Sequence, residues 1–172
     1  MKTIKLKLAI AMTAALAVAS FSRMFAQNVL PEITVVAENY KYLSAVNREE
    51  SAQPVDMLQQ YAAQYDVKAA PFYDETYNNY VVSFYIPEGK ILARYKDGQI
   101  QQTAERYEDV RLPKNITNAV AQKYPGWGIS KDVYLVTYYQ NQNASSRVYK
   151  LILDKGDQRV KTKIDDSGQF LK

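Results

Sequence analysis

Residues 149–164 read YKLILDKGDQRVKTKI, and this stretch decides the fold. On both sides of a turn at Gly156, every second residue is apolar or, at one position, threonine. These residues, expected to point inward, are Tyr149, Leu151, Leu153, Val160, Thr162 and Ile164. A period of two places alternating side chains on one face of a strand. The stretch therefore predicts an antiparallel hairpin with one packed face and one exposed face.

A matching pattern occurs earlier, with its inward positions at Val82, Phe84, Ile86, Ile91, Ala93 and Tyr95. Asp97-Gly98 follows it and favours a type I′ turn, because both central residues of that turn need positive φ. Each pattern comes after an amphipathic helical segment that starts with a proline, Pro54 in the first case and Pro113 in the second. The chain thus repeats a helix followed by a β-meander.

The repeat predicts an α+β fold of two tandem helix plus antiparallel β-meander units that share one sheet, with the helices on one face. The units are expected at residues 54–111 and 112–172. Residues 27–53 are expected to form an N-terminal leader rather than a core element, since Pro31 limits the β-prone run there to a sheet edge.

Residues 1–26 have the features of a secretory signal peptide. Three lysines precede an apolar run from Leu8 to Phe21, and Ala26 offers a small residue for cleavage before Gln27. The run is too short to span a membrane comfortably. We expect a periplasmic or secreted protein with no stable membrane span after cleavage; an uncleaved N-terminal anchor is the alternative.

The amino-acid composition excludes several classes of function. The chain has 22 basic and 18 acidic residues, but residues 1–26 hold four of the basic ones and none of the acidic ones. The remainder is balanced, so no nucleic-acid partner is expected. Cys and His are absent, which excludes disulfides, thiol nucleophiles and imidazole bases or ligands. With no phosphate-binding glycine loop or nucleophile elbow either, we expect no enzyme, no metal site and no cofactor.

Basic charge is concentrated in the second half. Residues 27–111 contain 8 basic and 13 acidic side chains, whereas residues 112–172 contain 10 and 5. This asymmetry favours an acidic partner for the second unit, or mutual attraction between the two halves. The outward cations of the second meander are Lys150, Arg159, Lys161 and Lys163. Outward lysines also serve to protect strands from edge-to-edge association.

Aromatic residues are the other candidates for a binding surface, because tyrosine combines a large rigid area with a hydroxyl group. Of the 15 tyrosines, those expected in the core are Tyr61, Tyr65, Tyr95, Tyr124 and Tyr149. The candidates for partner contact are Tyr85, Tyr134 or Tyr139, and Tyr138, with Arg94 on the first meander. Trp127 follows a helix stop and is expected either to fill the gap between helix and sheet or to anchor a binding surface.

Leu112-Pro113, the helix stop Tyr124-Pro125-Gly126-Trp127 and the strand Tyr149–Leu153 resemble the PepSY-like family of exported bacterial proteins, which is similar in fold to the β-lactamase inhibitor protein. The resemblance covers roughly residues 54–172 and is closer in the second unit. It implies a tandem helix–meander fold, a location in the bacterial cell envelope, and a binding or inhibitory role without catalytic residues.

We therefore expect an exported, non-enzymatic binding module, inhibitor-like, that engages another envelope protein or an acidic peptide through the outward face of its sheet. The alternative is an envelope carrier or structural protein that holds a small ligand or glycan on its Tyr-rich surface.

Overall fold

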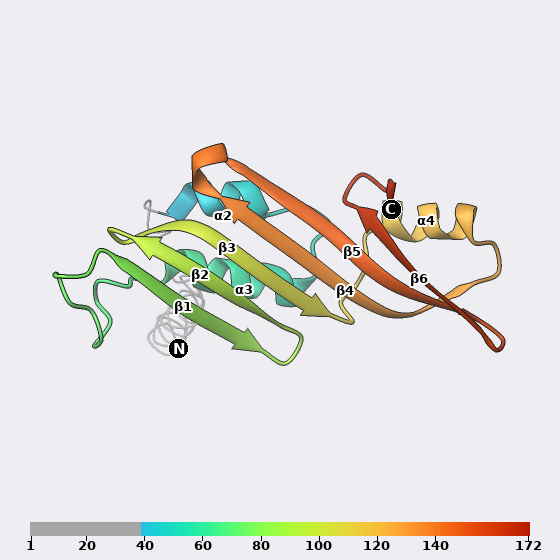
Figure 1. The fold of residues 1–172 in the computed structure, drawn as a ribbon, viewed down its shortest axis with the longest axis horizontal. Helices are drawn as coiled ribbons and strands as arrows, with labels where there is room; N and C mark the ends of the chain where they lie inside the picture. Colours follow the sequence, from blue (N-terminus) through green and yellow to red (C-terminus); the bar gives the residue numbers. More distant parts are fainter. Residues whose placement is uncertain (1–38) are drawn as a thin grey trace, which may run out of the picture. The chain divides into compact units, whose positions relative to one another are not determined.

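The computed structural model of the protein describes residues 39–172; the signal peptide predicted for residues 1–26 and the first part of the predicted leader lie outside the described residues. The elements are α2 (Tyr40–Val46), α3 (Gln53–Gln64), β1 (Asn79–Ile86), β2 (Gly89–Lys96), β3 (Gln99–Glu108), α4 (Lys114–Lys123), β4 (Gly128–Tyr139), the 3-10 turn η2 (Gln140–Gln142), β5 (Ala144–Lys155), β6 (Gln158–Asp165) and β7 (Phe170–Leu171). The strands form one sheet in chain order, and each pairs antiparallel with the next (Figure 1). The predicted antiparallel sheet is confirmed.

Short glycine turns keep consecutive strands in register. Asp97 has a φ of 53° and Gly98 a φ of 90°, as the type I′ turn predicted from this dipeptide requires. Gly156, with a φ of 58°, lies in the turn between β5 and β6. The loop from residue 65 to residue 78, which precedes β1, contains no strand.

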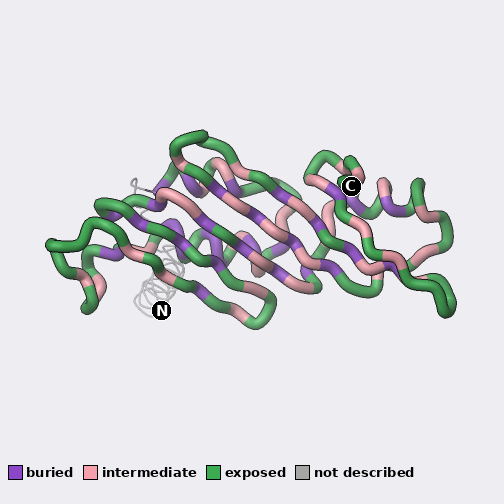
Figure 2. Tube along the Cα trace, in the orientation of Figure 1, coloured by how far each residue is buried: buried purple, intermediate pink, exposed green. Residues whose placement is uncertain are grey.

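The pleat of the strands divides their side chains between an inner face, which packs against helices, and an outer face. Figure 2 shows the resulting alternation of buried and exposed positions along the strands. The predicted inward residues all lie on the inner face. Those that are buried are Phe84, Ile91, Ala93, Tyr95, Tyr149, Leu151, Leu153 and Ile164.

Helix α3 covers the inner face of β1 and β2. Pro54 lies in its first turn, where a missing N–H costs nothing. Its buried apolar residues are Val55, Leu58, Ala62 and Ala63. The Tyr95 hydroxyl donates a 2.9 Å hydrogen bond to the Ala62 carbonyl oxygen. The expectation that Tyr61 lies in the core is wrong, because its side chain is 61% exposed, although its ring packs edge-on against Phe84.

The expectation that residues 27–53 lie outside the core is wrong for the described part of that segment. Tyr42 and Val46 of α2 are each 1% exposed. They are four residues apart and so share one side of the helix. The Tyr42 ring packs edge-on against Tyr138 of β4, with 5.4 Å between ring centroids. A tertiary contact thus stabilises a helix of seven residues that is too short to be stable alone.

The predicted fold class of two tandem units with one helix each is wrong. The described chain forms a single seven-stranded meander, and its three short helices do not follow the repeat. Strands β4 and β5 have 12 residues each and so extend about 40 Å, whereas α4 has 10 residues and extends about 15 Å. Because α4 cannot cover strands of this length, α2, from before the first predicted unit, packs against them instead.

Candidate functional site

The outer face of the sheet has no helix against it in residues 39–172, since the helices contact inner-face side chains. Its exposed cations on β2 are Lys90, Arg94 and Lys96, and those on the last strands are Lys131, Lys150, Arg159, Lys161 and Lys163. Aliphatic side chains lie among them, namely Val133, Ile152 and Leu171. This part of the face is therefore both cationic and apolar.

Strand register fixes how these side chains alternate. Lys150 of β5 stands directly opposite Lys163 of β6. Val133 flanks Lys150 on β4, and Leu171 flanks Lys163 on β7. The neighbouring row consists of Lys131, Ile152 and Lys161. Residues directly opposite in an antiparallel pair have Cβ atoms about 4.5–5.5 Å apart, and like charges at that spacing destabilise the sheet.

A groove of about 480 Å³ runs along these two rows of alternating lysine and aliphatic side chains, and we call it the β5–β6 groove. Five of its ten lining residues are lysines, and none is acidic. The remaining lining residues are Val133, Leu151, Ile152, Thr162 and Leu171. A hollow with an apolar floor and a cationic rim suits a ligand that carries negative charge next to aliphatic groups.

Only part of the positive charge on this face is neutralised within the protein. Lys131 Nζ lies 3.5 Å from Glu108 Oε2. Arg159 donates to both carboxylate oxygens of Asp154, at 2.7 and 2.9 Å, and these hydrogen bonds lower the pKa of Asp154 to about 2. Within residues 39–172, by contrast, no carboxylate oxygen lies within 4.0 Å of the ammonium groups of Lys150, Lys161 and Lys163, the other exposed cations that β5 and β6 place on the outer face. Arg159, a predicted contact residue, is thus already paired.

Two predicted contact residues lie on the outer face but away from the groove. Tyr85 of β1 is 69% exposed, and Arg94 of β2 is also exposed. Strand β2 is three strands from β5, or about 14 Å, so the structure does not bring Arg94 together with the groove lysines. Trp127 is half-buried against the core, with its ring edge-on to Tyr124.

Tyr134 and Tyr138, both predicted to contact a partner, are buried on the inner face. Tyr138 is 0% exposed beneath Tyr42. Tyr134 is 4% exposed and stacks on Tyr149, with 4.4 Å between ring centroids. Residues 133–139 are apolar or aromatic at nearly every position, so their sequence gives no alternation from which to assign faces.

Sequence reasoning missed the aliphatic floor of the groove. The signal was present in the run Leu151-Ile152-Leu153, which is apolar at three consecutive positions. Such a run places apolar groups on both faces of a strand. Leu151 and Leu153 are buried, whereas Ile152 points to the outer face and is only half-buried.

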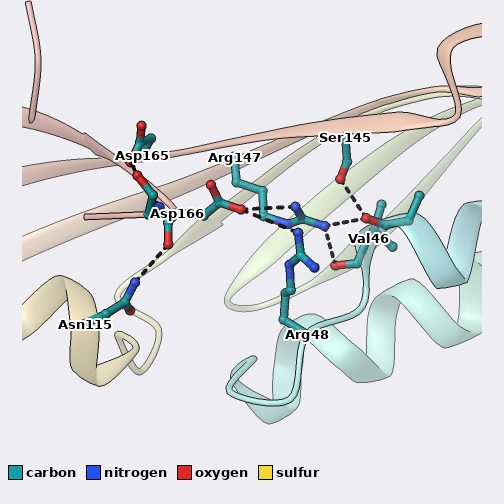
Figure 3. Close-up of polar contacts among 9 residues, drawn as sticks. Val46, Arg48, Asn115, Ser145, Arg147, Asp165 and Asp166 are labelled. Carbon is teal, nitrogen blue, oxygen red and sulfur yellow. Dashed lines mark hydrogen bonds and ion pairs between the residues drawn. The ribbon is translucent and has the colours of Figure 1, made fainter. Parts of the chain in front are cut away.

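On the inner side, Arg147 fastens α2 to β5 (Figure 3). Its side chain is 2% exposed. The guanidinium donates hydrogen bonds to the carbonyl oxygens of Ala45 and Val46 and pairs with Asp166 Oδ2 at 3.3 Å. Arg48 approaches the same carboxylate at 3.6 Å. Because the last carbonyls of a helix have no intrahelical partners, this arginine satisfies the end of α2.

A second cavity of about 620 Å³ lies beside this cluster, with Tyr134 and Tyr149 in its wall. Its charged lining residues are Arg48, Glu49, Glu50, Arg147 and Asp166. Both arginines face the Asp166 carboxylate, and two further acidic residues line the cavity. It is therefore less suited to an anion than the β5–β6 groove.

Glu105 of β3 is the centre of a buried polar cluster. Its carboxylate accepts hydrogen bonds from Tyr42, Gln59 and Thr103, each 2.8 Å long, and from Tyr107 at 3.0 Å. Burial raises the pKa of Glu105, although the four donors act in the opposite direction. The donors come from α2, α3 and β3, so the cluster joins two helices to the sheet.

Residues 39–172 contain no cluster of His, Cys, Asp or Glu side chains that is placed to hold a metal ion. No helix in the same part of the chain is long and apolar enough to cross a membrane. Comparisons of the chain with protein-family models, curated proteins and solved structures find no match. The resemblance to the PepSY-like family thus stays a prediction from sequence motifs.

Proposed function

We propose that this protein is an exported, non-enzymatic binding module that takes an acidic segment of another envelope protein into the β5–β6 groove. The periplasm or the extracellular space is the proposed location, on the basis of the signal-peptide pattern at residues 1–26. The observation that carries the binding proposal is the juxtaposition of Lys150 and Lys163. They are directly opposite on neighbouring strands, and no carboxylate of residues 39–172 neutralises them.

This juxtaposition has a cost that a bound anion would remove. Cross-strand pairs contribute about 0.2–1 kcal/mol, and a like-charged pair is unfavourable by a similar amount. A carboxylate placed between the two ammonium groups would add two attractions that outweigh the one repulsion. The free protein is therefore slightly less stable than it would be without this like-charged pair, and binding of an acidic partner removes that destabilisation.

Protection of an exposed sheet edge does not account for the whole arrangement. Outward lysines on an edge strand discourage unwanted pairing, and this explains Lys161 and Lys163 of β6. Lys150, however, lies on β5, which is paired along its length with β4 on one side and with β6 on the other. An interior strand needs no such protection, so the cation at position 150 supports a binding role.

The test uses a fluorescein-labelled seven-residue peptide with glutamate at odd and valine at even positions, followed by fluorescence anisotropy. We expect saturable binding that weakens with rising salt, since the attraction is screened. A peptide with glutamine in place of glutamate should bind at least tenfold more weakly. The double variant Lys150→Glu with Lys163→Glu should also reduce affinity at least tenfold while keeping the cross-strand repulsion, and with it the stability, close to wild type.

The matched control is Lys41→Glu with Lys68→Glu, which changes net charge equally at two exposed positions outside the sheet. This variant should bind the acidic peptide within about twofold of wild type. If both double variants lose affinity equally, net charge alone explains the loss of binding, and the proposal is contradicted. Unchanged binding in the Lys150→Glu, Lys163→Glu variant would contradict it as well.

The second cavity favours another function, a carrier of a small ligand or glycan. Its volume of about 620 Å³ exceeds the roughly 300 Å³ at the lower end of small-ligand sites, and its stacked tyrosines offer an aromatic wall. Binding of a glycan or aromatic compound that Tyr149→Leu weakens and the lysine double variant leaves unchanged would favour the carrier function over ours.

A further inference from the structure

Strand β6 has an open backbone edge next to the β5–β6 groove. It pairs with β5 from Gln158 to Asp165, but with β7 only at Lys163 and Ile164. In residues 39–172, no strand therefore lies beside residues 158–162 on that side. Backbone N–H and C=O groups at such an edge are able to pair with another extended chain.

The open edge and the groove share residues. Lys161 and Thr162 line the groove, and so do Lys163 and Leu171, which stand opposite each other on β6 and β7. A strand added in line with β7 would thus lie at the border of the groove. One of its outward side chains would stand opposite Lys161 and diagonal to Lys163, a spacing that long side chains can bridge.

The two faces of β6 differ chemically along this edge. Lys161 is exposed on the outer face and has no carboxylate within 4.0 Å in the described residues. Val160 and Thr162 point to the inner face and are only half-buried. An added strand would meet positive charge on its outer side and incompletely covered side chains on its inner side. Alternating acidic and apolar residues fit this pair of surfaces.

We propose that residues 158–162 of β6 take the acidic partner segment as an eighth, antiparallel strand in line with β7, with an acidic side chain toward Lys161 and Lys163 and apolar side chains toward Val160. This inference rests on the proposed function and specifies how the partner binds. Main-chain hydrogen bonds to the edge supply affinity, and the alternating side chains supply specificity. The competing role of the same edge is to repel any added strand through its lysines.

The test compares three peptides with the same side chains: the glutamate–valine heptapeptide, a version N-methylated at every valine, and a version N-methylated at every glutamate. In a strand, the N–H groups of alternate residues point to the same edge, so each methylated version blocks one edge only. We expect one version to bind at least tenfold more weakly than the unmodified peptide and the other to bind within about threefold of it.

Hydrogen exchange adds a readout on the protein itself. The unmodified peptide should slow amide exchange in residues 158–162 by at least tenfold, while exchange in β1 stays unchanged. Binding of both methylated versions within twofold of the unmodified peptide, with no protection of residues 158–162, would overturn strand addition.

The lysine variants separate the two proposals. If both methylated peptides bind well and Lys150→Glu with Lys163→Glu still abolishes binding, the groove binds acidic side chains without strand addition, and only this inference fails. If that variant binds like wild type, the proposed function fails as well. Absence of measurable binding by the unmodified peptide overturns both.

Discussion

The Tyr42 hydroxyl donates a 2.8 Å hydrogen bond to the carboxylate of Glu105, 63 residues away in the chain. Tyr42 is 1% exposed and Glu105 3% exposed. A short helix from before the predicted repeat is thereby tied to the third strand of the sheet. The same carboxylate accepts a hydrogen bond from Gln59 of α3, so two helices depend on one buried acidic side chain.

Replacement of Glu105 should therefore lower the free energy of unfolding much more when both acceptor oxygens are removed than when one is kept. Glu105→Ala leaves four buried donors without an acceptor, and each orphaned group costs about 1–3 kcal/mol. We expect a loss of at least about 3 kcal/mol in the free energy of unfolding. Glu105→Gln should lose less than about half of that, because the Tyr42 and Thr103 hydroxyls can turn to accept hydrogen bonds from the new amide group. Urea denaturation measures both; equal losses would contradict this account of the cluster.

Asp132 should make stability depend on pH near neutrality. Burial raises the pKa of its carboxyl group to about 6, and the nearby Asp109 charge acts in the same direction. One carboxylate oxygen of Asp132 is buried without a hydrogen-bond partner. A folded-state pKa above the unfolded value of 3.8 means that the stabilisation is present below about pH 4 and is lost as pH rises through 6.

Asp132→Asn removes this titration. We expect wild type to lose on the order of 2 kcal/mol relative to the variant between pH 4 and pH 7. Thermal or urea unfolding at several pH values gives the difference curve. Asp154 and Glu108, whose pKa values are lowered, are common to both proteins and cancel in that difference. A flat curve would show that Asp132 does not carry the effect.

Lys150→Glu alone should stabilise the protein while it weakens binding. The substitution turns the repulsion opposite Lys163 into an attraction, which is worth about 0.5–1 kcal/mol and raises the midpoint of thermal unfolding by a few degrees. The same variant should bind the acidic peptide more weakly than wild type does. A purely structural role for Lys150 predicts no such opposition between stability and binding.

The control for this experiment is Lys68→Glu, at an exposed loop position, for which we expect no change beyond about 0.5 kcal/mol. If Lys150→Glu destabilises the protein, the two lysines do not repel each other as the register implies.

Export should remove the N-terminal segment. We expect the protein recovered from the envelope or the medium to begin at Gln27, because Ala26 supplies the small residue before the cleavage point. Intact-mass spectrometry of the purified protein decides this. A retained Met1 would contradict the signal-peptide prediction and favour an uncleaved anchor.

Local pattern was sufficient to predict several features of the sheet. Alternation at residues 149–164 assigned the side chains of β5 and β6 to the two faces of the sheet. The dipeptide Asp97-Gly98 predicted the turn that it forms. Both signals depend on neighbouring residues alone. Lys150, Lys161 and Lys163 were likewise placed on the outward face by alternation. The local pattern around Pro54 and Pro113 also located α3 and α4, which start next to these prolines.

The tertiary structure decided the rest, because long-range contacts have no local signal. The repeat suggested tandem units, but the length of β4 and β5 left inner-face area that α4 does not cover, and α2 packs there through Tyr42. Tyr134 and Tyr138 lie in an unbroken apolar run, so only pairing with neighbouring strands assigned them to the inner face. The sequence by itself determined the alternation of each strand and the charge it carries. Only the pairing of β5 with β4 and of β6 with β7 placed Val133 beside Lys150 and Leu171 beside Lys163, because these neighbours depend on how separate segments pair.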